Sequence, residues 1–158
     1  MDVNIKRGRL YSGFTLIEII IVVVILGILA SIALHKVTAN IDKVRAAEAF
    51  NMGGAIAKAF DRCLADETAG KAIKAADVAN CTTFTNLKVE DPSPGSLSFT
   101  YILSLSNPLE LEMDAEGKAA LGLNPAVDTI TFYFDAVTGS VSKDCGGATS
   151  KFFKMCKN

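Results

Sequence analysis

The sequence has few of the groups from which enzymes build active sites. Its 158 residues include one histidine, His35, and no Cys-x-x-Cys pair, glycine-rich phosphate loop or nucleophile elbow. His35 stands beside Lys36, at the end of a long apolar segment, and is predicted to be an interfacial residue rather than a metal ligand or a base. We therefore expect no enzyme activity, no cofactor and no metal site.

An excess of positive charge is also missing. The 16 Lys and Arg residues and 17 Asp and Glu residues give a formal net charge of −1, whereas binding to nucleic acid needs concentrated Lys and Arg to displace counterions from phosphates. Residues 151–157 alternate lysines with Phe152 and Phe153. The preferred interpretation is a strand with its apolar residues turned inward. Nucleic acid is therefore a possible partner, but the overall charge does not support it.

Hydrophobic residues form one long run, from Phe14 to Leu34. Its 21 residues, at about 1.5 Å each, span roughly 31 Å, close to the hydrocarbon thickness of a bilayer. Lys6, Arg7 and Arg9 precede the run, and a basic leader stays in the cytoplasm by the positive-inside rule. The sequence therefore predicts a single membrane pass, with the N-terminus cytoplasmic and the C-terminal part on the far side.

Four cysteines follow the apolar run, at Cys63, Cys81, Cys145 and Cys156. Disulfides are typical of cysteines outside the cytoplasm. Four cysteines permit three pairings, and the sequence does not choose among them. Our hypothesis is that the two pairs close in sequence form, Cys63 with Cys81 and Cys145 with Cys156.

One carboxylate, Glu18, interrupts the apolar run. A charge in lipid costs about 2.5–3.5 kcal/mol, so Glu18 should have a partner. If a peptidase cuts after Gly13, Phe14 gains an amino group that is mostly protonated at neutral pH. Within one helix, Phe14 and Glu18 are one turn apart. Alternatively, Glu18 of one subunit neutralises the Phe14 amine of another, which is the interpretation that we favour.

The string Gly13-Phe14-Thr15-Leu16-Ile17-Glu18, between a short basic leader and an unbroken apolar helix, resembles the processing site of type IV pilins and pseudopilins. The short leader and the phenylalanine resemble the type IVa branch. The resemblance implies a peptidase that cuts between Gly13 and Phe14 and N-methylates Phe14. It also implies that Glu18 guides assembly of a helical homopolymer, driven by an assembly platform and an ATPase.

The resemblance is strong over residues 6–34 only. Family members often have a proline where this chain has His35, and proline kinks a helix. A helix without it should be straighter. The sequence therefore does not decide whether the helix unwinds between Gly27 and Leu34 in a filament. At the other end of the chain, the resemblance implies a disulfide-bounded region that forms exposed filament surface.

The apolar helix is predicted to continue into a folded domain. Apolar or small residues recur at alternating spacings of four and three at Ala46, Phe50, Gly53, Ala57, Phe60 and Leu64, which indicates an amphipathic helix. Gly53 and Gly54 would allow a bend or close packing. We expect four segments: a cleaved leader, 1–13; a transmembrane and assembly helix, 14–34; an amphipathic continuation, 35–65; and a globular head, 66–158.

The head is predicted to hold an antiparallel meander. Patterns rich in β-branched, aromatic or alternating apolar residues predict strands at Leu97–Leu105, Leu109–Met113 and Thr129–Phe134, with a last strand at Ser140–Lys143. A turn is expected at Ala115–Gly117. The connection Asp66–Gly95 is long, with a short helix near Ala72–Ala79. One face of the sheet should pack on the amphipathic helix, which makes an α+β fold of pilin-like architecture.

These features predict a structural subunit of a type IV pilus that serves motility, adhesion or DNA uptake. As a precursor it should lie in the inner membrane, surrounded by lipid, and after assembly in a surface pilus or the periplasm. Two alternatives stay open: a pseudopilin of a type II secretion system, and a membrane-tethered binding or enzymatic domain. The tether alternative makes Glu18 dispensable, whereas the assembly prediction does not.

Overall fold

The computed structural model describes residues 14–156, and for residues 34–36, 38 and 39 it describes the backbone alone. The predicted leader, including Gly13, lies outside the described residues. Two compact units make up the chain, with the division between Ala39 and Asn40. Helix α1, Leu16–Thr68, is 53 residues long and contributes to both. Its residues 16–39 are the described secondary structure of the first unit.

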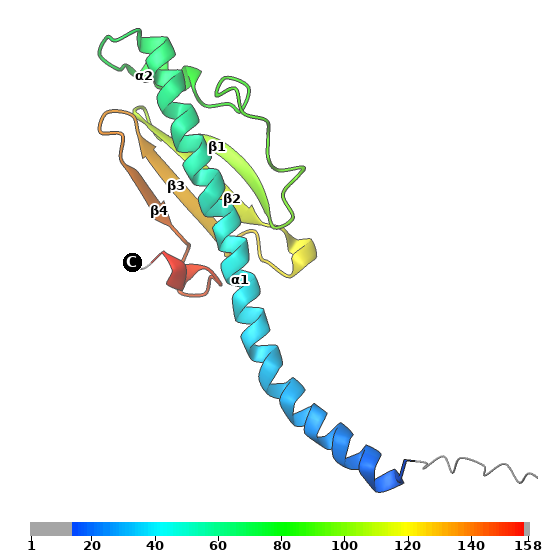
Figure 1. The fold of residues 1–158 in the computed structure, drawn as a ribbon. Coiled ribbons are helices and arrows are strands. Elements are labelled where there is room, and N and C mark those ends of the chain that lie inside the picture. Colours follow the sequence, from blue (N-terminus) through cyan, green and yellow to red (C-terminus); the bar gives the residue numbers. More distant parts are fainter. Residues whose placement is uncertain (1–13, 157–158) are drawn as a thin grey trace, which may run out of the picture. The chain divides into compact units, whose positions relative to one another are not determined.

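The second unit is an α+β domain, as the sequence predicted (Figure 1). Residues 40–68 of α1 lead through a short helix, α2 (Ala75–Asn80), to a four-stranded antiparallel sheet in the order β1-β2-β3-β4. The strands are β1 (Phe99–Asn107), β2 (Glu110–Gly117), β3 (Thr129–Asp135) and β4 (Val141–Asp144). Two 3₁₀ turns complete the unit, η1 (Ala119–Leu121) and η2 (Phe153–Met155).

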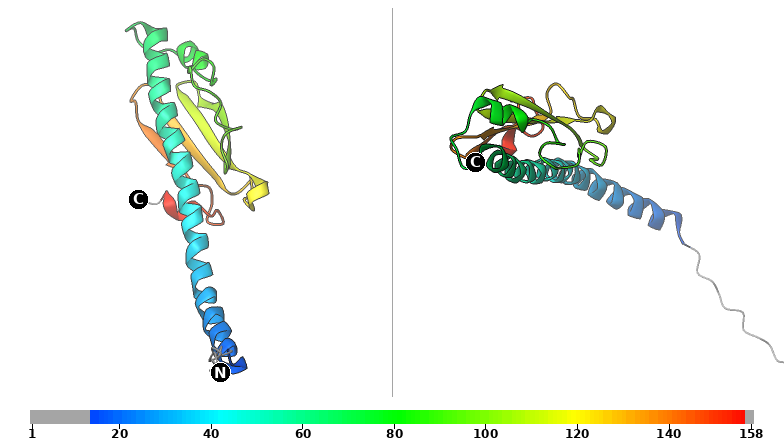
Figure 2. Two further views of the ribbon diagram at one scale, coloured as in Figure 1. Left: turned by 45° about the vertical axis from the view of Figure 1, so that its right-hand side comes forward. Right: turned by 90° about the horizontal axis from the view of Figure 1, so that it is seen from above.

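Residues 40–68 of α1 cover one face of this sheet (Figure 2). In β2 and β3 every second side chain is buried, because alternate residues of a strand point to opposite faces. The inward phenylalanines of β3 meet the helix, with Phe132 edge-on to Phe50 at 5.9 Å and Phe134 tilted against Phe60 at 6.4 Å between ring centroids. The amphipathic pattern of the helix therefore supplies one side of the core.

Two local predictions are wrong. The predicted turn at Ala115–Gly117 is strand, because β2 keeps its alternation to Gly117, and Ala115 pairs with Tyr101 on one side and Ile130 on the other. The strand predicted over residues 151–157 is not found in its described part. Phe152 is fully buried, but Phe153–Met155 forms the turn η2.

The paired glycines of α1 have different environments, and the helix runs through both. A Cβ atom on Gly53 would lie 2.7 Å from the Phe132 ring, whereas a Cβ on Gly54 would meet nothing within 4 Å. Phe132 cannot easily yield, because it is 4% exposed and stacks on Phe134. Gly53 thus permits close packing of the helix on the sheet, while Gly54 is an exposed helical glycine.

Alanine at these two positions should change stability in opposite directions. Gly53→Ala should lower the free energy of unfolding by about 1–3 kcal/mol, because it overpacks a filled core. Gly54→Ala should raise it by up to about 1 kcal/mol, because alanine is the better helix former. Thermal unfolding of the detergent-solubilised chain measures both, and equal effects at the two positions would contradict the packing.

Candidate assembly site

Helix α1 begins with a polar cap inside an otherwise apolar segment. The Thr15 hydroxyl accepts the N–H of Glu18 at 3.4 Å, and the Thr15 carbonyl accepts the same N–H at 3.1 Å. A threonine that caps the third helical residue, with glutamate there, is the spacing of a capping box. Thr15 is not among the site residues predicted from the sequence, although the Thr-x-x-Glu spacing identifies it. Glu18 lies in the first turn, where the helix macrodipole favours a negative charge.

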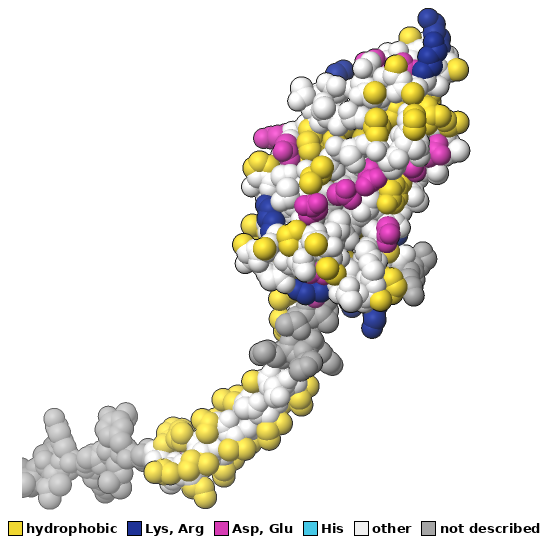
Figure 3. Space-filling model, turned by 180° about the vertical axis from the view of Figure 1, so that it is seen from behind, with side chains coloured by type: hydrophobic (Ala, Val, Ile, Leu, Met, Phe, Trp, Pro, Cys, Tyr) yellow, Lys and Arg dark blue, Asp and Glu magenta, His cyan; other side chains and the backbone are white. Residues whose placement is uncertain are grey.

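The residues after this cap expose apolar side chains in every direction. Leu16–Ala33 is long and apolar enough to cross a membrane, and none of this window is buried within the described structure. Phe14, immediately before the helix, is 78% exposed. Figure 3 shows apolar side chains along the visible face of this part of the helix. A helix that is apolar on every face is stable only when lipid or other apolar helices surround it.

The predicted site residues divide between described and undescribed parts of the chain. Phe14 and Glu18 lie at the same end of the apolar helix, four residues apart, and Glu18 has no ion-pair partner among the described side chains. Gly13 is outside the described residues, as is the side chain of His35. The backbone of α1 is helical throughout residues 27–35.

All four cysteines are paired in disulfides. Cys63 of α1 joins Cys81, the residue that follows α2, with 6.0 Å between their Cα atoms. Cys145, after β4, joins Cys156 with 5.7 Å between Cα atoms, which closes the C-terminal segment into a ring. The two bonds therefore tie the long connection to α1, and the C-terminal segment to the end of the sheet.

The C-terminal ring is held on the domain by apolar and polar contacts. Phe152 packs against Phe99 with 5.5 Å between ring centroids. Buried Asp128 accepts the backbone N–H of Lys151 at 2.8 Å and that of Asn124 at 2.9 Å. Since Phe152 is buried and the Lys151 ammonium donates to the carbonyl of Gly122, these two residues are not a free basic-aromatic surface for nucleic acid.

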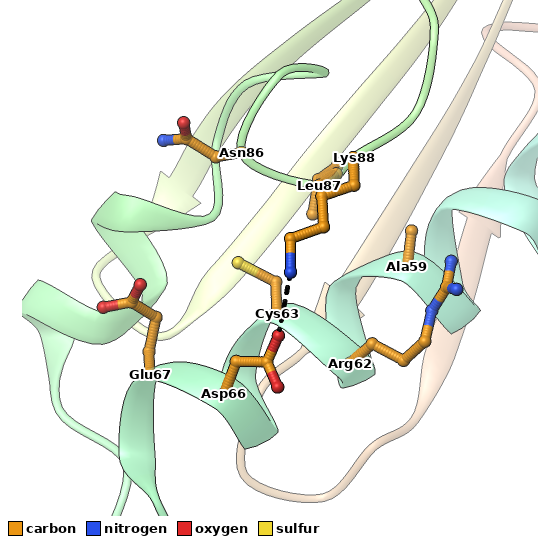
Figure 4. Close-up of a pocket in the computed structure, with 8 residues that line it drawn as sticks. All are labelled: Ala59, Arg62, Cys63, Asp66, Glu67, Asn86, Leu87 and Lys88. Carbon is orange, nitrogen blue, oxygen red and sulfur yellow. Dashed lines mark hydrogen bonds and ion pairs between the residues drawn. The ribbon is translucent and has the colours of Figure 1, made fainter.

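A pocket of about 220 Å³ lies between α1 and the connection that follows α2 (Figure 4). Its charged groups have partners close by. Lys88 and Asp66 form an ion pair at 3.2 Å, and Glu67 accepts a hydrogen bond from Asn80 at 3.0 Å. Among the described residues no three His, Cys, Asp or Glu side chains gather as metal ligands. The pocket therefore supplies no converging set of unpaired groups.

The sheet face away from α1 carries a row of acids along β2 (Figure 3). Glu110, Glu112, Asp114 and Glu116 alternate with the buried residues of this strand. Partial burial, and then the charges of Asp114 and Glu110, raise the pKa of Glu112 above its ordinary value of 4.5. Like charges on one face thus repel each other at neutral pH.

An exposed apolar helix with an acid in its first turn, joined to a disulfide-bonded α+β domain, defines a pilin-like protein. Comparison with known proteins agrees with this class. Residues 8–34 match the family described as the prokaryotic N-terminal methylation motif. Over 122 residues, 73% of this chain and 78% of the relative, the chain is 32% identical to the type IV major fimbrial protein FimA of Dichelobacter nodosus. No solved structure matches.

The chain belongs to the type IV pilin family. This family consists of structural pilins rather than enzymes. Its members are subunits that assemble into a filament.

Removing one charge from the acidic row should stabilise the domain in a pH-dependent way. Because the pKa of Glu112 is higher in the folded chain than in the unfolded chain, Glu112 lowers the free energy of unfolding as pH rises from about 4.5 through the raised value. Glu112→Gln should therefore raise the melting temperature at pH 7, by a small amount because solvent screens the charges. The difference should vanish well below pH 4.5.

Glu116→Gln is the matched control, because it lies on the same face of β2 but has an acid at only one of the two alternate positions along the strand. Thermal unfolding at several pH values compares the two variants. A gain for Glu112→Gln that persists unchanged in acid, or is no larger than that of the control, would rule out charge repulsion as its cause.

Proposed function

We propose that this chain is a structural subunit of a type IV pilus, assembled through its N-terminal helix into a helical homopolymer. The observation that carries the proposal is the window Leu16–Ala33, which exposes apolar side chains on every face and so needs lipid or other helices around it. Membership of the type IV pilin family supports the same function. The pilus would serve motility, adhesion or DNA uptake.

The mature subunit would arise by processing in the membrane. A prepilin peptidase would cut between Gly13 and Phe14 and N-methylate the new amine of Phe14. The segments proposed for the precursor are a leader, 1–13, a transmembrane and assembly helix, 14–34, an amphipathic continuation, 35–65, and a head, 66–158. The match of residues 8–34 to the N-terminal methylation motif supports this processing.

Before assembly, the subunit would lie in the inner membrane with its N-terminus cytoplasmic and its head on the far side. The disulfides of the second unit suit that oxidising side. An assembly platform and its ATPase would then move the helix from lipid into the filament, so that the head reaches the cell surface. Both environments are apolar, and the exchange therefore costs little hydrophobic free energy.

Glu18 would make that exchange favour the filament. In lipid an unpaired carboxylate costs about 2.5–3.5 kcal/mol. In a bundle of copies, Glu18 of one subunit would pair with the Phe14 amine of another, and the two charges would neutralise each other. The Thr15 cap supports this role, because it starts the helix three residues before Glu18 and places the acid in the first turn.

A pseudopilin of a secretion system would use the same helix and processing, and a tethered binding domain would use the helix as an anchor alone. The relative that covers most of this chain is a major fimbrial protein, which favours the pilus. The tethered-domain alternative makes a different prediction, because a helix that only anchors the chain would function without Glu18.

Replacing Glu18 should separate membrane insertion from assembly. Glu18→Val should insert and be cut after Gly13 like the wild type, because it makes the run more apolar. Filament yield should fall roughly 100-fold, the factor that corresponds to leaving one charge unpaired in an apolar bundle. Membrane fractionation, mass spectrometry of the N-terminus and quantification of sheared filaments measure these three steps.

Ser31→Val is the matched control, because it replaces an exposed polar residue by valine within the same apolar window. It should leave the filament yield close to that of the wild type. Normal filaments from Glu18→Val would contradict the role proposed for Glu18 in assembly.

A further inference from the structure

The carboxylate of Glu48 has no cation beside it among the described side chains. Glu48 lies on α1 within the second unit, is half-buried, and accepts a hydrogen bond from the Ser96 hydroxyl through Oε1. The ion pairs of the described side chains are those of Asp42, Asp66 and Asp128. An ionised carboxylate offers about four acceptor positions, so most of its capacity is unused.

The groups that hold the neighbouring loop in place are already engaged. The ammonium of Lys118 donates to the carbonyl oxygens of Ser93 at 2.8 Å and of Ser96 at 2.6 Å. The Ser96 hydroxyl accepts the N–H of Phe99 at 2.9 Å while it donates to Glu48. Lys118 therefore stabilises the loop without forming an ion pair with Glu48.

Tyr101 of β1 adds a second unsatisfied group near Glu48. It is 4% exposed, and its hydroxyl has no hydrogen-bond partner among the described residues. Burial, and then the negative charge of Glu48, raise the pKa of Tyr101 to about 12 against a smaller opposing effect of the Ser96 hydroxyl, so the tyrosine hydroxyl is neutral at physiological pH. Because this hydroxyl is itself buried, Tyr101 forms part of the wall, and the group that an incoming cation meets is the carboxylate of Glu48.

Glu48 and Tyr101 line one open pocket of about 300 Å³. Met52, Pro92 and Gly95 contribute to its walls, which are mostly apolar, and Ser96 completes it. This combination of an apolar passage and a carboxylate with free acceptor positions is complementary to one kind of side chain. Lysine has an apolar stem and an ammonium with three donors.

We propose that this pocket receives a lysine side chain from a neighbouring copy of the same chain, whose ammonium donates to the carboxylate of Glu48. The inference rests on the proposed function, because it needs the chain to polymerise. Each copy carries exposed lysines that have no ion-pair partner among the described side chains, including Lys43, Lys58, Lys71, Lys74 and Lys154. A pocket and a lysine on different surfaces make a heterologous contact, and such contacts repeat into an open helical filament when they do not close a ring.

Carbodiimide crosslinking of sheared wild-type filaments tests the inference, because it joins a carboxylate to an amine only where the two are in contact. Mass spectrometry should find Glu48 joined to a lysine in covalent dimers, and this link should be absent from detergent-solubilised monomers. Glu48→Gln keeps an oxygen for Ser96 but removes the charge, and should reduce filament yield about tenfold, which corresponds to 1.4 kcal/mol. Asp61→Asn, which removes one exposed charge from the same helix, is the control and should assemble normally.

Several results would overturn the inference. One is a wild-type filament in which Glu48 links only to Lys118 of its own chain, or to a different protein. Another is a filament without Glu48 links between copies, together with equal assembly of Glu48→Gln and Asp61→Asn. Circular dichroism of Glu48→Gln in detergent should match the wild type, which separates lost assembly from lost folding. Absence of this chain from wild-type filaments would instead overturn the proposed function itself.

Discussion

Removal of the apolar side chains of Leu16–Ala33 from water is the requirement on which the rest of the structure depends. At about 25 cal/mol for each Å² of apolar surface, exposure of such a window in water costs far more than a domain's usual stability. Because the window is apolar on all faces and none of it is buried, the described chain cannot meet this requirement alone. In the proposed function, lipid would meet it before assembly and neighbouring helices would meet it afterwards, which gives the helix two stable environments.

Lipid and a bundle of apolar helices differ little in hydrophobic free energy for this window. Polar groups therefore decide which of the two is favoured. At the start of α1, Thr15 caps the helix and Glu18 lies in the first turn, so the one acid of the apolar run is at the end where the macrodipole favours it. In the second unit, the carboxylate of Glu48 likewise has no cation beside it among the described side chains. Both carboxylates are complementary to cations, and in the proposed filament a second copy would supply one to each.

Sequence patterns predicted the α+β fold and the order of the strands, because burial alternates with the period of each element. They failed where the outcome depended on contacts between distant segments. Ala115–Gly117 has turn-forming composition, but pairing with β1 and β3 keeps it in β2. The helical pattern places Gly53 on the apolar face, but the close approach of Phe132 that makes glycine necessary there involves a residue 79 positions away. The grouping of Glu48 with Ser96 joins residues 48 positions apart, which no local pattern reveals.

The central claim is that this chain polymerises through a processed N-terminal helix. The most direct measurement is mass spectrometry of filaments sheared from cells that express it, with identification of their subunits and reading of their N-termini. The account predicts that this chain is the main component and that it begins at N-methylated Phe14. Abundant filaments in which this chain is absent or scarce, or in which it retains residues 1–13, would contradict it.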